Sequence, residues 1–209
     1  MSRIELHNVD CLPFMKQCSD KQFDLAIVDP PYGIGAGMMQ MGNNPSKKWS
    51  KKDWDSTIPI KDFFEELQRI SKNQIIWGGN YFDLPKTGGW IVWDKNNGES
   101  DFADGELAWT SFNKPLRITK HHWCGSASNW EDTKGKIHPT QKPVDLYKWL
   151  LHNYAKPGDK IIDTHLGSGS IALACEEYGY DLTACEIDKE YFEAASKRLS
   201  DYRVQMRLF

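Results

Sequence analysis

The chain has 209 residues, 40% of them hydrophobic, so it is long enough for one α/β domain with a sizeable core and too short for two. Its formal net charge of −3 argues against a uniformly basic nucleic-acid binder. No stretch approaches the ~20 apolar residues of a membrane span, and the N-terminus lacks the apolar core of a signal peptide. Five cysteines without Cys-x-x-Cys spacing indicate reduced thiols, so we expect a cytoplasmic protein without membrane contact.

Strand-like and helix-like segments alternate along the chain. Phe63, Phe64, Leu67 and Ile70, for example, recur at helical spacing. The expected strands are 3–7, 25–28, 74–77, 90–93, 106–112, 117–122, 160–163 and 182–186. The expected helices are 13–18, 60–71, 144–154, 170–178 and 189–199. This alternation predicts a single α/β domain over residues 1–209, with helices on both faces of a mostly parallel sheet.

The apolar run 25–28 is followed directly by Asp29-Pro30-Pro31-Tyr32. Proline cannot donate to a sheet ladder and holds its predecessor extended, so the strand should stop here in a rigid polar end. A carboxylate, fixed backbone carbonyls and an aromatic face at one spot are suited to gripping an amino group on a flat heteroaromatic ring. Taken alone, the four residues could equally form an ordinary strand-to-loop turn.

A second motif begins at the strand 160–163 and continues through the loop Gly167-Ser168-Gly169 into a helix of small residues. Glycines at a helix start let backbone N–H groups approach a ligand closely. The next strand ends in Glu186, where a carboxylate can bind the hydroxyl pair of a ribose. The unit therefore predicts a nucleotide site.

Together, the two motifs resemble those of the S-adenosylmethionine-dependent DNA amino methyltransferases, which make N6-methyladenine or N4-methylcytosine. In that family an Asp-Pro-Pro-Tyr tetrad is catalytic and an Asp-x-x-x-Gly-x-Gly loop holds the methyl donor. Here the tetrad precedes the loop, with segment 138–143 between them, an order that resembles the permuted beta class. Segments 75–82, 90–95 and 106–109 extend the resemblance over most of the chain. It implies a Rossmann-like methyltransferase fold with a mostly parallel seven-stranded sheet and a circularly permuted motif order.

The resemblance also implies roles for individual residues and no metal ion. The expected catalytic residues are Asp29, Pro30, Pro31 and Tyr32. The residues expected to bind the cofactor, S-adenosylmethionine, are Asp10, Cys11, Thr140, Lys142, Asp163, His165, Gly167, Ser168, Gly169 and Glu186.

Three of these assignments have alternatives. Asp10 could accept from the adenine amino group of the cofactor or cap the helix 13–18, and the cofactor role is favoured because the resemblance places Asp10 there. In segment 138–143, Thr140 or Lys142 could meet the methionine carboxylate, or the segment could be an ordinary helix start. His165 stands where the family usually has an aromatic residue, and a neutral imidazole filling that slot is favoured over a titrating group.

The expected partner is double-stranded or single-stranded DNA, in a bacterium or a phage-infected host. Lys47, Lys48, Lys51 and Lys52 surround Trp49 in a loop that could clamp a phosphate backbone, or that could be a solvated surface loop. We expect target recognition in the segments 33–55 and 113–136, which could instead form a homodimer contact.

The expected reaction is methyl transfer to the N6 amino group of an adenine flipped out of the helix. Within the family, Asp as the first tetrad residue favours adenine and Ser favours cytosine, so adenine is the expected base. N4-cytosine methylation is the alternative. A methyltransferase acting on RNA or on protein amides is a further alternative. The enzyme could belong to a restriction-modification system or act as an orphan or phage-type modifier. A catalytically dead subunit and a nicotinamide oxidoreductase are disfavoured, the latter because it leaves the tetrad unexplained.

Overall fold

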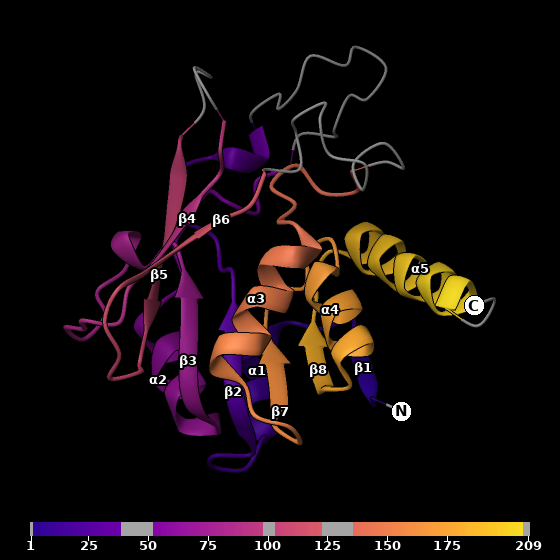
Figure 1. Ribbon diagram of the computed structural model, residues 1–209, viewed down its shortest axis with the longest axis horizontal. Helices are drawn as coiled ribbons and strands as arrows, with labels where there is room; N and C mark the ends of the chain where they lie inside the picture. The colour runs from indigo at the N-terminus through magenta and orange to yellow at the C-terminus, as the bar shows by residue number, and fades with distance from the viewer. Residues whose placement is uncertain (1, 39–51, 98–102, 123–135, 207–209) are drawn as a thin grey trace.

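The computed structural model describes residues 2–38, 52–97, 103–122 and 136–206, which form one sheet with helices on both faces (Figure 1). The strands are β1 (Ile4–His7), β2 (Phe23–Val28), β3 (Ser71–Trp77), β4 (Ile91–Asp94), β5 (Gly105–Thr110), β6 (Arg117–Lys120), β7 (Lys160–Asp163) and β8 (Asp181–Cys185). The helices are α1 (Cys11–Gln17), α2 (Lys61–Ile70), α3 (Val144–Tyr154), α4 (Ser170–Tyr178) and α5 (Lys189–Met206), with short 3-10 turns η1 (Ala36–Met38) and η2 (Gly79–Tyr81).

The strand order is β1-β8-β7-β2-β3-β5-β4-β6. The first five strands in this order are parallel, β5 runs antiparallel to both β3 and β4, and β6 is parallel to β4. The mostly parallel sheet is confirmed, but the expected count of seven strands is wrong, because eight strands pair within the described residues. Arg117–Lys120 adds the last edge strand by pairing Ile118 with Val92.

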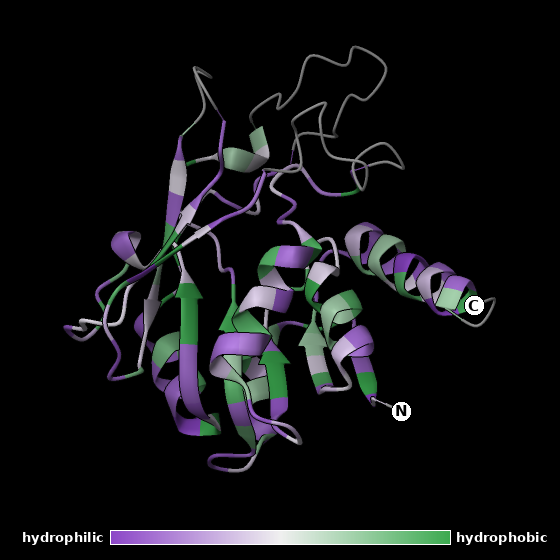
Figure 2. Cartoon of the chain, in the orientation of Figure 1, coloured by the Kyte–Doolittle hydropathy of each residue, from purple (hydrophilic) through white to green (hydrophobic). Residues whose placement is uncertain are grey.

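Alternation along the buried strands divides the core in two. Leu25 and Ile27 of β2 pack into a cluster with α3, α4 and α5, whereas Ala26 and Val28 face the cluster formed with α1 and α2. Both faces of β2 are therefore buried, which explains its continuous apolar run. Figure 2 shows β2 and β7 coloured predominantly as hydrophobic.

Two helix boundaries differ from those expected. Helix α1 begins at Cys11 rather than at residue 13, because the Asp10 side chain accepts from Leu12 N–H at 3.0 Å and caps the helix. Helix α5 continues to Met206, with the ion pair Lys197–Asp201 (2.8 Å) joining successive turns. None of the helices in the described ranges is long and apolar enough to cross a membrane.

The parallel register brings the two sequence motifs to one edge of the sheet. Strands β2, β7 and β8 are neighbours that run in the same direction, so their carboxyl ends lie together. Asp29, Asp163 and Glu186 follow or end these strands. In an open α/β sheet, the crevice outside the carboxyl ends of the strands is where ligands bind.

Candidate active site

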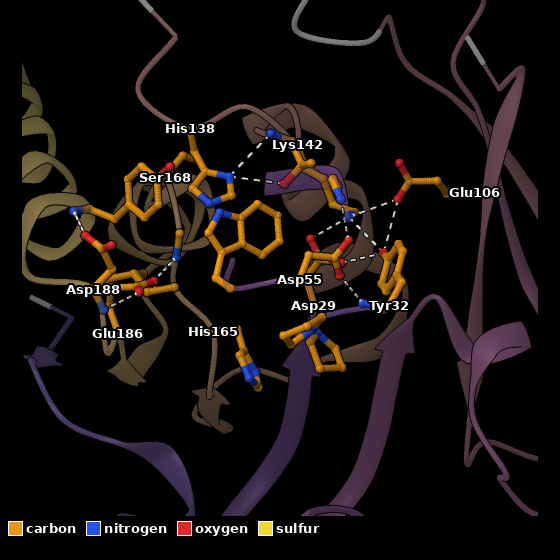
Figure 3. A pocket seen from close by; sticks show the side chains of 18 of the residues that line it. Asp29, Tyr32, Asp55, Glu106, His138, Lys142, His165, Ser168, Glu186 and Asp188 are labelled. Carbon is orange, nitrogen blue, oxygen red and sulfur yellow. Dashed lines mark hydrogen bonds and ion pairs between the residues drawn. The ribbon is translucent and has the colours of Figure 1, made fainter. Parts of the chain in front are cut away.

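A cavity of about 500 Å³ opens at this edge of the sheet, and both sequence motifs line it (Figure 3). Ten of the fourteen expected site residues border the cavity: Asp29, Pro30, Pro31, Tyr32, Thr140, Lys142, His165, Gly167, Ser168 and Glu186. Four others, Asp10, Cys11, Asp163 and Gly169, do not line it. The tetrad and the glycine loop, more than a hundred residues apart in sequence, thus share one space.

The tetrad carboxylate is held by two hydrogen bonds. Asp29 Oδ1 accepts from the Tyr32 hydroxyl at 2.5 Å, and Asp29 Oδ2 accepts from Lys142 Nζ at 2.5 Å (Figure 3). Burial raises the pKa of Asp29, and the Lys142 ammonium opposes that rise. The carboxylate is therefore fixed in orientation before any ligand arrives.

Two residues of the neighbouring antiparallel strands extend this arrangement. Glu106 at the start of β5 accepts from Lys142 at 2.9 Å and from Lys95 at 2.7 Å. Burial would raise the pKa of Glu106, but the two adjacent ammonium groups lower it to about 2, so Glu106 is ionised. Asp29, Glu106, Lys95 and Lys142 form a buried cluster of two carboxylates and two ammonium groups.

The Tyr32 ring lies in a slot formed by Gly78 and Tyr81. Tyr32 and Tyr81 are stacked, with centroids 5.1 Å apart and planes 13° from parallel. A Cβ on Gly78 would lie 2.2 Å from Tyr32 Cε1, and Gly78 has a φ of +68°. Only glycine meets both conditions, which explains the second glycine-rich match to the family, in segment 75–82.

The loop after the tetrad is fixed by Asp55, which is only 2% exposed. Its carboxylate accepts from the backbone N–H groups of Tyr32 (2.6 Å), Gly33 (3.0 Å) and Ala36 (2.7 Å). Three such charge-assisted bonds stabilise the carboxylate and hold the tetrad backbone in place.

On the other side of the cavity, the glycine loop joins β7 to α4. Gly167 has a φ of +52°, and its N–H donates to Glu186 Oε2 at 2.8 Å. Glu186 Oε1 accepts from Asp188 N–H at 2.9 Å. The Asp188 carboxylate in turn accepts from the first N–H groups of α5. The loop, the acid and the next helix are therefore linked through backbone donors, with the Glu186 carboxylate facing the cavity.

Two residues of this loop that were expected to bind the cofactor, Gly169 and Asp163, contact other parts of the protein instead of lining the cavity. Gly169 has a φ of +72°, and a Cβ there would lie 3.1 Å from Ala195 Cβ of α5. Asp163 is buried under the loop and accepts from His165 N–H at 2.9 Å; burial raises its pKa to about 8. Cofactor contacts for these two residues remain predictions.

The imidazole of His165 packs as an aromatic side chain. It lies edge-on to Phe63, with centroids 5.4 Å apart, and its Nδ1 meets Thr164 Oγ1 at 2.9 Å. Burial lowers the pKa of His165 to about 4. These contacts and the lowered pKa fit a neutral imidazole that fills the aromatic slot, and a role of His165 in cofactor binding remains a prediction.

The remaining expected cofactor residues have other contacts. Asp10 caps α1, the alternative left open by the sequence, and Cys11 begins that helix with a thiol whose pKa burial raises to about 12. Thr140 lies beside His138, with Oγ1 at 3.1 Å from Nδ1. Lys142 lies against Asp29 rather than beside the glycine loop. The donor-binding roles of Asp10, Cys11, Thr140 and Lys142 remain predictions.

The expected basic clamp is only partly tested. Lys47, Lys48, Trp49 and Lys51 lie outside the described residues, as does most of segment 113–136. Lys52 is described, and its ammonium bonds Asp188 at 2.6 Å and Glu190 at 2.7 Å. Two carboxylates at the start of α5 therefore already pair with Lys52, and the clamp as a whole stays a prediction.

Several other lining residues were not assigned individually from the sequence, among them Tyr81, Lys95, Glu106 and Asp188, together with Trp54 and Asp55 of the expected recognition segment 33–55. Lys95 and Glu106 lie in the segments 90–95 and 106–109, which resemble the family. That resemblance singled out the two segments but gave no function to these residues. Asp188 follows Glu186 by two residues before a helix, a capping pattern that could have identified it. The chain offers no comparable local signal for Asp55, whose partners lie about twenty residues earlier.

Comparisons with known proteins show which proteins this chain is similar to in sequence and in fold. A family model described as "DNA methylase", of the N6/N4 methyltransferase type, matches residues 104–197. The type II methyltransferase M1.MboII of Moraxella bovis is 22% identical over 272 residues, covering 96% of this chain and 98% of the relative. The crystal structure of the M1.HpyAVI–SAM complex superposes with a TM-score of 0.60 at 20% identity, covering 94% of this chain and all of that one. The PvuII cytosine-N4-specific DNA methyltransferase gives a TM-score of 0.60 at 14% identity, covering 97% and 92%.

Proposed function

We propose that this chain is a DNA methyltransferase of the N6/N4 type that transfers a methyl group from S-adenosylmethionine to the N6 amino group of adenine in DNA. The observation that carries the proposal is the shared cavity: the Asp29 tetrad lines one side and the Gly167–Glu186 unit lines the other. Each unit alone is compatible with several functions, whereas their meeting in one cavity matches transfer from a nucleoside cofactor to an amino group.

The residues on the β8 side fit S-adenosylmethionine. Glu186 offers a buried carboxylate to a ribose hydroxyl pair. A Cβ built on Gly167 would meet nothing nearer than the His138 ring at 3.8 Å, so the space beside this glycine is open to a ligand. Ile187, 67% exposed at the cavity, offers an apolar surface to a flat base. S-adenosylmethionine supplies a methyl group on a positively charged sulfur. The residues on the β8 side would hold this cofactor in the cavity.

The residues on the β2 side fit the amino group of a flipped base. The amino nitrogen of adenine is a weak nucleophile, because its lone pair is delocalised into the ring. The Asp29 carboxylate and the Pro30 carbonyl oxygen would each accept a hydrogen bond from one N–H of this amino group. These hydrogen bonds would draw the nitrogen toward tetrahedral geometry. The nitrogen would then bond to the methyl carbon in line, the electron pair of the carbon–sulfur bond would return to the sulfur of the donor, which leaves as a neutral thioether, and the surplus amino proton would pass to solvent while Asp29 orients the nitrogen.

Tyr32 and Tyr81 provide the flat surfaces that an extruded base needs. The two rings are stacked at the cavity, and Tyr81 is 44% exposed. A base removed from a duplex loses its stacking partners, and aromatic side chains recover part of that energy. Adenine is proposed rather than cytosine because the tetrad begins with Asp.

The proposal is tested by incubating the purified chain with labelled S-adenosylmethionine and unmethylated DNA, followed by nucleoside mass spectrometry. We expect label in N6-methyladenine. Label in N4-methylcytosine would overturn the choice of base and leave the family reaction in place. Label only in RNA or protein would overturn DNA as the substrate.

A further inference from the structure

A buried lysine at the active site is fully occupied by side chains of the base-binding wall. Lys142 is 4% exposed and immediately precedes Pro143, which leads into α3. Its ammonium bonds Asp29 Oδ2 at 2.5 Å, Glu106 Oε2 at 2.9 Å and the Tyr32 hydroxyl oxygen at 3.3 Å. An ammonium group has three N–H donors, and these three contacts use them all. The ammonium therefore has no hydrogen left for a cofactor carboxylate.

The oxygens of Asp29 are divided between Lys142 and Tyr32. Oδ2 accepts from Lys142 and Oδ1 accepts from Tyr32, so each oxygen keeps one further lone pair. With both oxygens tied, the carboxylate cannot rotate without breaking a hydrogen bond. The remaining lone pairs keep a fixed direction in the cavity.

We propose, on the basis of the function proposed above, that Lys142 is a positioning residue that fixes Asp29 as an ionised, oriented hydrogen-bond acceptor for the amino group of the base. A protonated Asp29 would offer a hydrogen where the reaction needs a lone pair, so its ionised form is the active one. Lys142 acts through Asp29 and does not touch the base or the cofactor.

Glu106 and Lys95 complete the arrangement by balancing charge. Lys142 with Asp29 and Glu106 alone would leave a net negative charge in a buried site, and the Lys95–Glu106 ion pair at 2.7 Å compensates for it. The charged and titratable groups that act on Asp29 come from separate elements: Lys142 before α3, Glu106 on β5, Asp163 on β7, and Tyr32 in the same loop. In the described part of the chain, the Lys142 ammonium favours the ionised Asp29 carboxylate and the Glu106 carboxylate opposes it.

The direct test follows the protonation of Asp29 by carbon-13 NMR of its carboxyl carbon, assigned with Asp29→Asn. The titration is compared in wild type, Lys142→Met and Glu106→Gln. Removal of the ammonium should move the midpoint of Asp29 upward, and removal of the Glu106 charge should move it downward. These opposite shifts are expected in the protein without cofactor or DNA. Glu106→Gln keeps the test available if Lys142→Met does not fold.

The kinetic arm uses single-turnover methyl transfer at saturating S-adenosylmethionine. Lys142→Met should lower the transfer rate at neutral pH about 100-fold, comparable to removing one preorganised electrostatic group, with part of the rate regained at higher pH. The dissociation constant for S-adenosylmethionine should stay within about twofold. The matched control is Lys148→Met on α3, whose ammonium pairs with Glu177 at 2.8 Å away from the cavity, and it should change neither quantity.

Two results would overturn the proposal. One is an Asp29 midpoint that does not respond to either substitution. The other is a Lys142→Met enzyme that transfers at the wild-type rate but binds S-adenosylmethionine at least tenfold more weakly, which would place Lys142 at the methionine end. If wild type shows the NMR coupling but methylates no DNA, the positioning of Asp29 stands and the proposed function falls.

Discussion

The two walls of the cavity are built in different ways. In the proposed methyl-donor half, consisting of Gly167, Ser168, Glu186 and Asp188, backbone N–H groups that donate to carboxylates are the main links, and Lys52 adds one ion pair to Asp188. In the proposed base half, consisting of Asp29, Tyr32, Glu106 and Lys142, backbone bonds to Asp55 hold the loop, but the four side chains are held by bonds to one another. A backbone-built wall tolerates side-chain changes that keep its glycines and acid. A wall built from a charge cluster depends on every member, because each loss leaves a buried partner unsatisfied.

The largest effect should come from Asp29 in the base half. Asp29→Ala removes the group that accepts the amino hydrogens and leaves Lys142 with one carboxylate. We expect methyl transfer to fall by at least about 100-fold while S-adenosylmethionine still binds. Single-turnover transfer and calorimetric titration of the cofactor measure the two quantities. Asp20→Ala, a surface carboxylate paired with Arg69, is the control and should transfer normally. Substantial transfer by Asp29→Ala would show that the cluster is structural.

A smaller effect should come from Gly78, which shapes the Tyr32 slot. The added Cβ of Gly78→Ala would lie 2.2 Å from Tyr32 Cε1 at a φ of +68°. Strain and overpacking together should reduce the free energy of unfolding by about 2 kcal/mol or more, measured by urea denaturation. Methyl transfer should fall as well, because Tyr32 must move away from Asp29. Gly88→Ala, where a Cβ meets nothing within 4 Å, should change neither, and equal behaviour of the two variants would refute the slot.

The smallest effect concerns His165 on the methyl-donor side and is confined to acid. Its pKa of about 4 in the folded protein lies below the ordinary ~6.5, so the unfolded chain binds more protons between these values and stability falls as pH falls through this window. Between pH 7 and pH 5, His165 should cost about 2 kcal/mol, a loss that His165→Phe should avoid. Denaturation of both proteins at the two pH values measures this difference. The exposed His152→Phe is the control; a pH dependence of His165→Phe equal to that of wild type would contradict the assignment.

The same contrast explains what could be predicted from the sequence. The methyl-donor half lies within residues 163–188, so the strand, glycines and acid appeared as one local pattern. The tetrad was visible because prolines follow an aliphatic run. Glu106 and Asp55 were not assigned, because their partners lie far away along the chain and depend on how β5 and the loop before α2 are placed.

Two departures from the sequence expectations have the same origin. Lys52 was grouped with neighbouring lysines because they cluster around Trp49 just after the tetrad, yet its tertiary partners Asp188 and Glu190 come from another part of the chain. The strand count was taken from the resemblance, although the eight apolar segments had each been recognised. In both cases the sequence identified the charged residue or the strand segments. It could not show which distant residues or strands they pair with in the folded protein.

The most direct test of the two-wall account is the rate of methyl transfer to DNA across a series of S-adenosylmethionine concentrations, with Asp29→Ala and Glu186→Gln side by side. Glu186→Gln should raise the half-saturating concentration by about 10–100-fold, the cost of one or two charged hydrogen bonds, and keep a plateau near wild type. Asp29→Ala should lower the plateau and keep the half-saturating concentration. A lowered plateau with unchanged half-saturation in Glu186→Gln, or weakened cofactor binding in Asp29→Ala, would contradict the separation of the two walls.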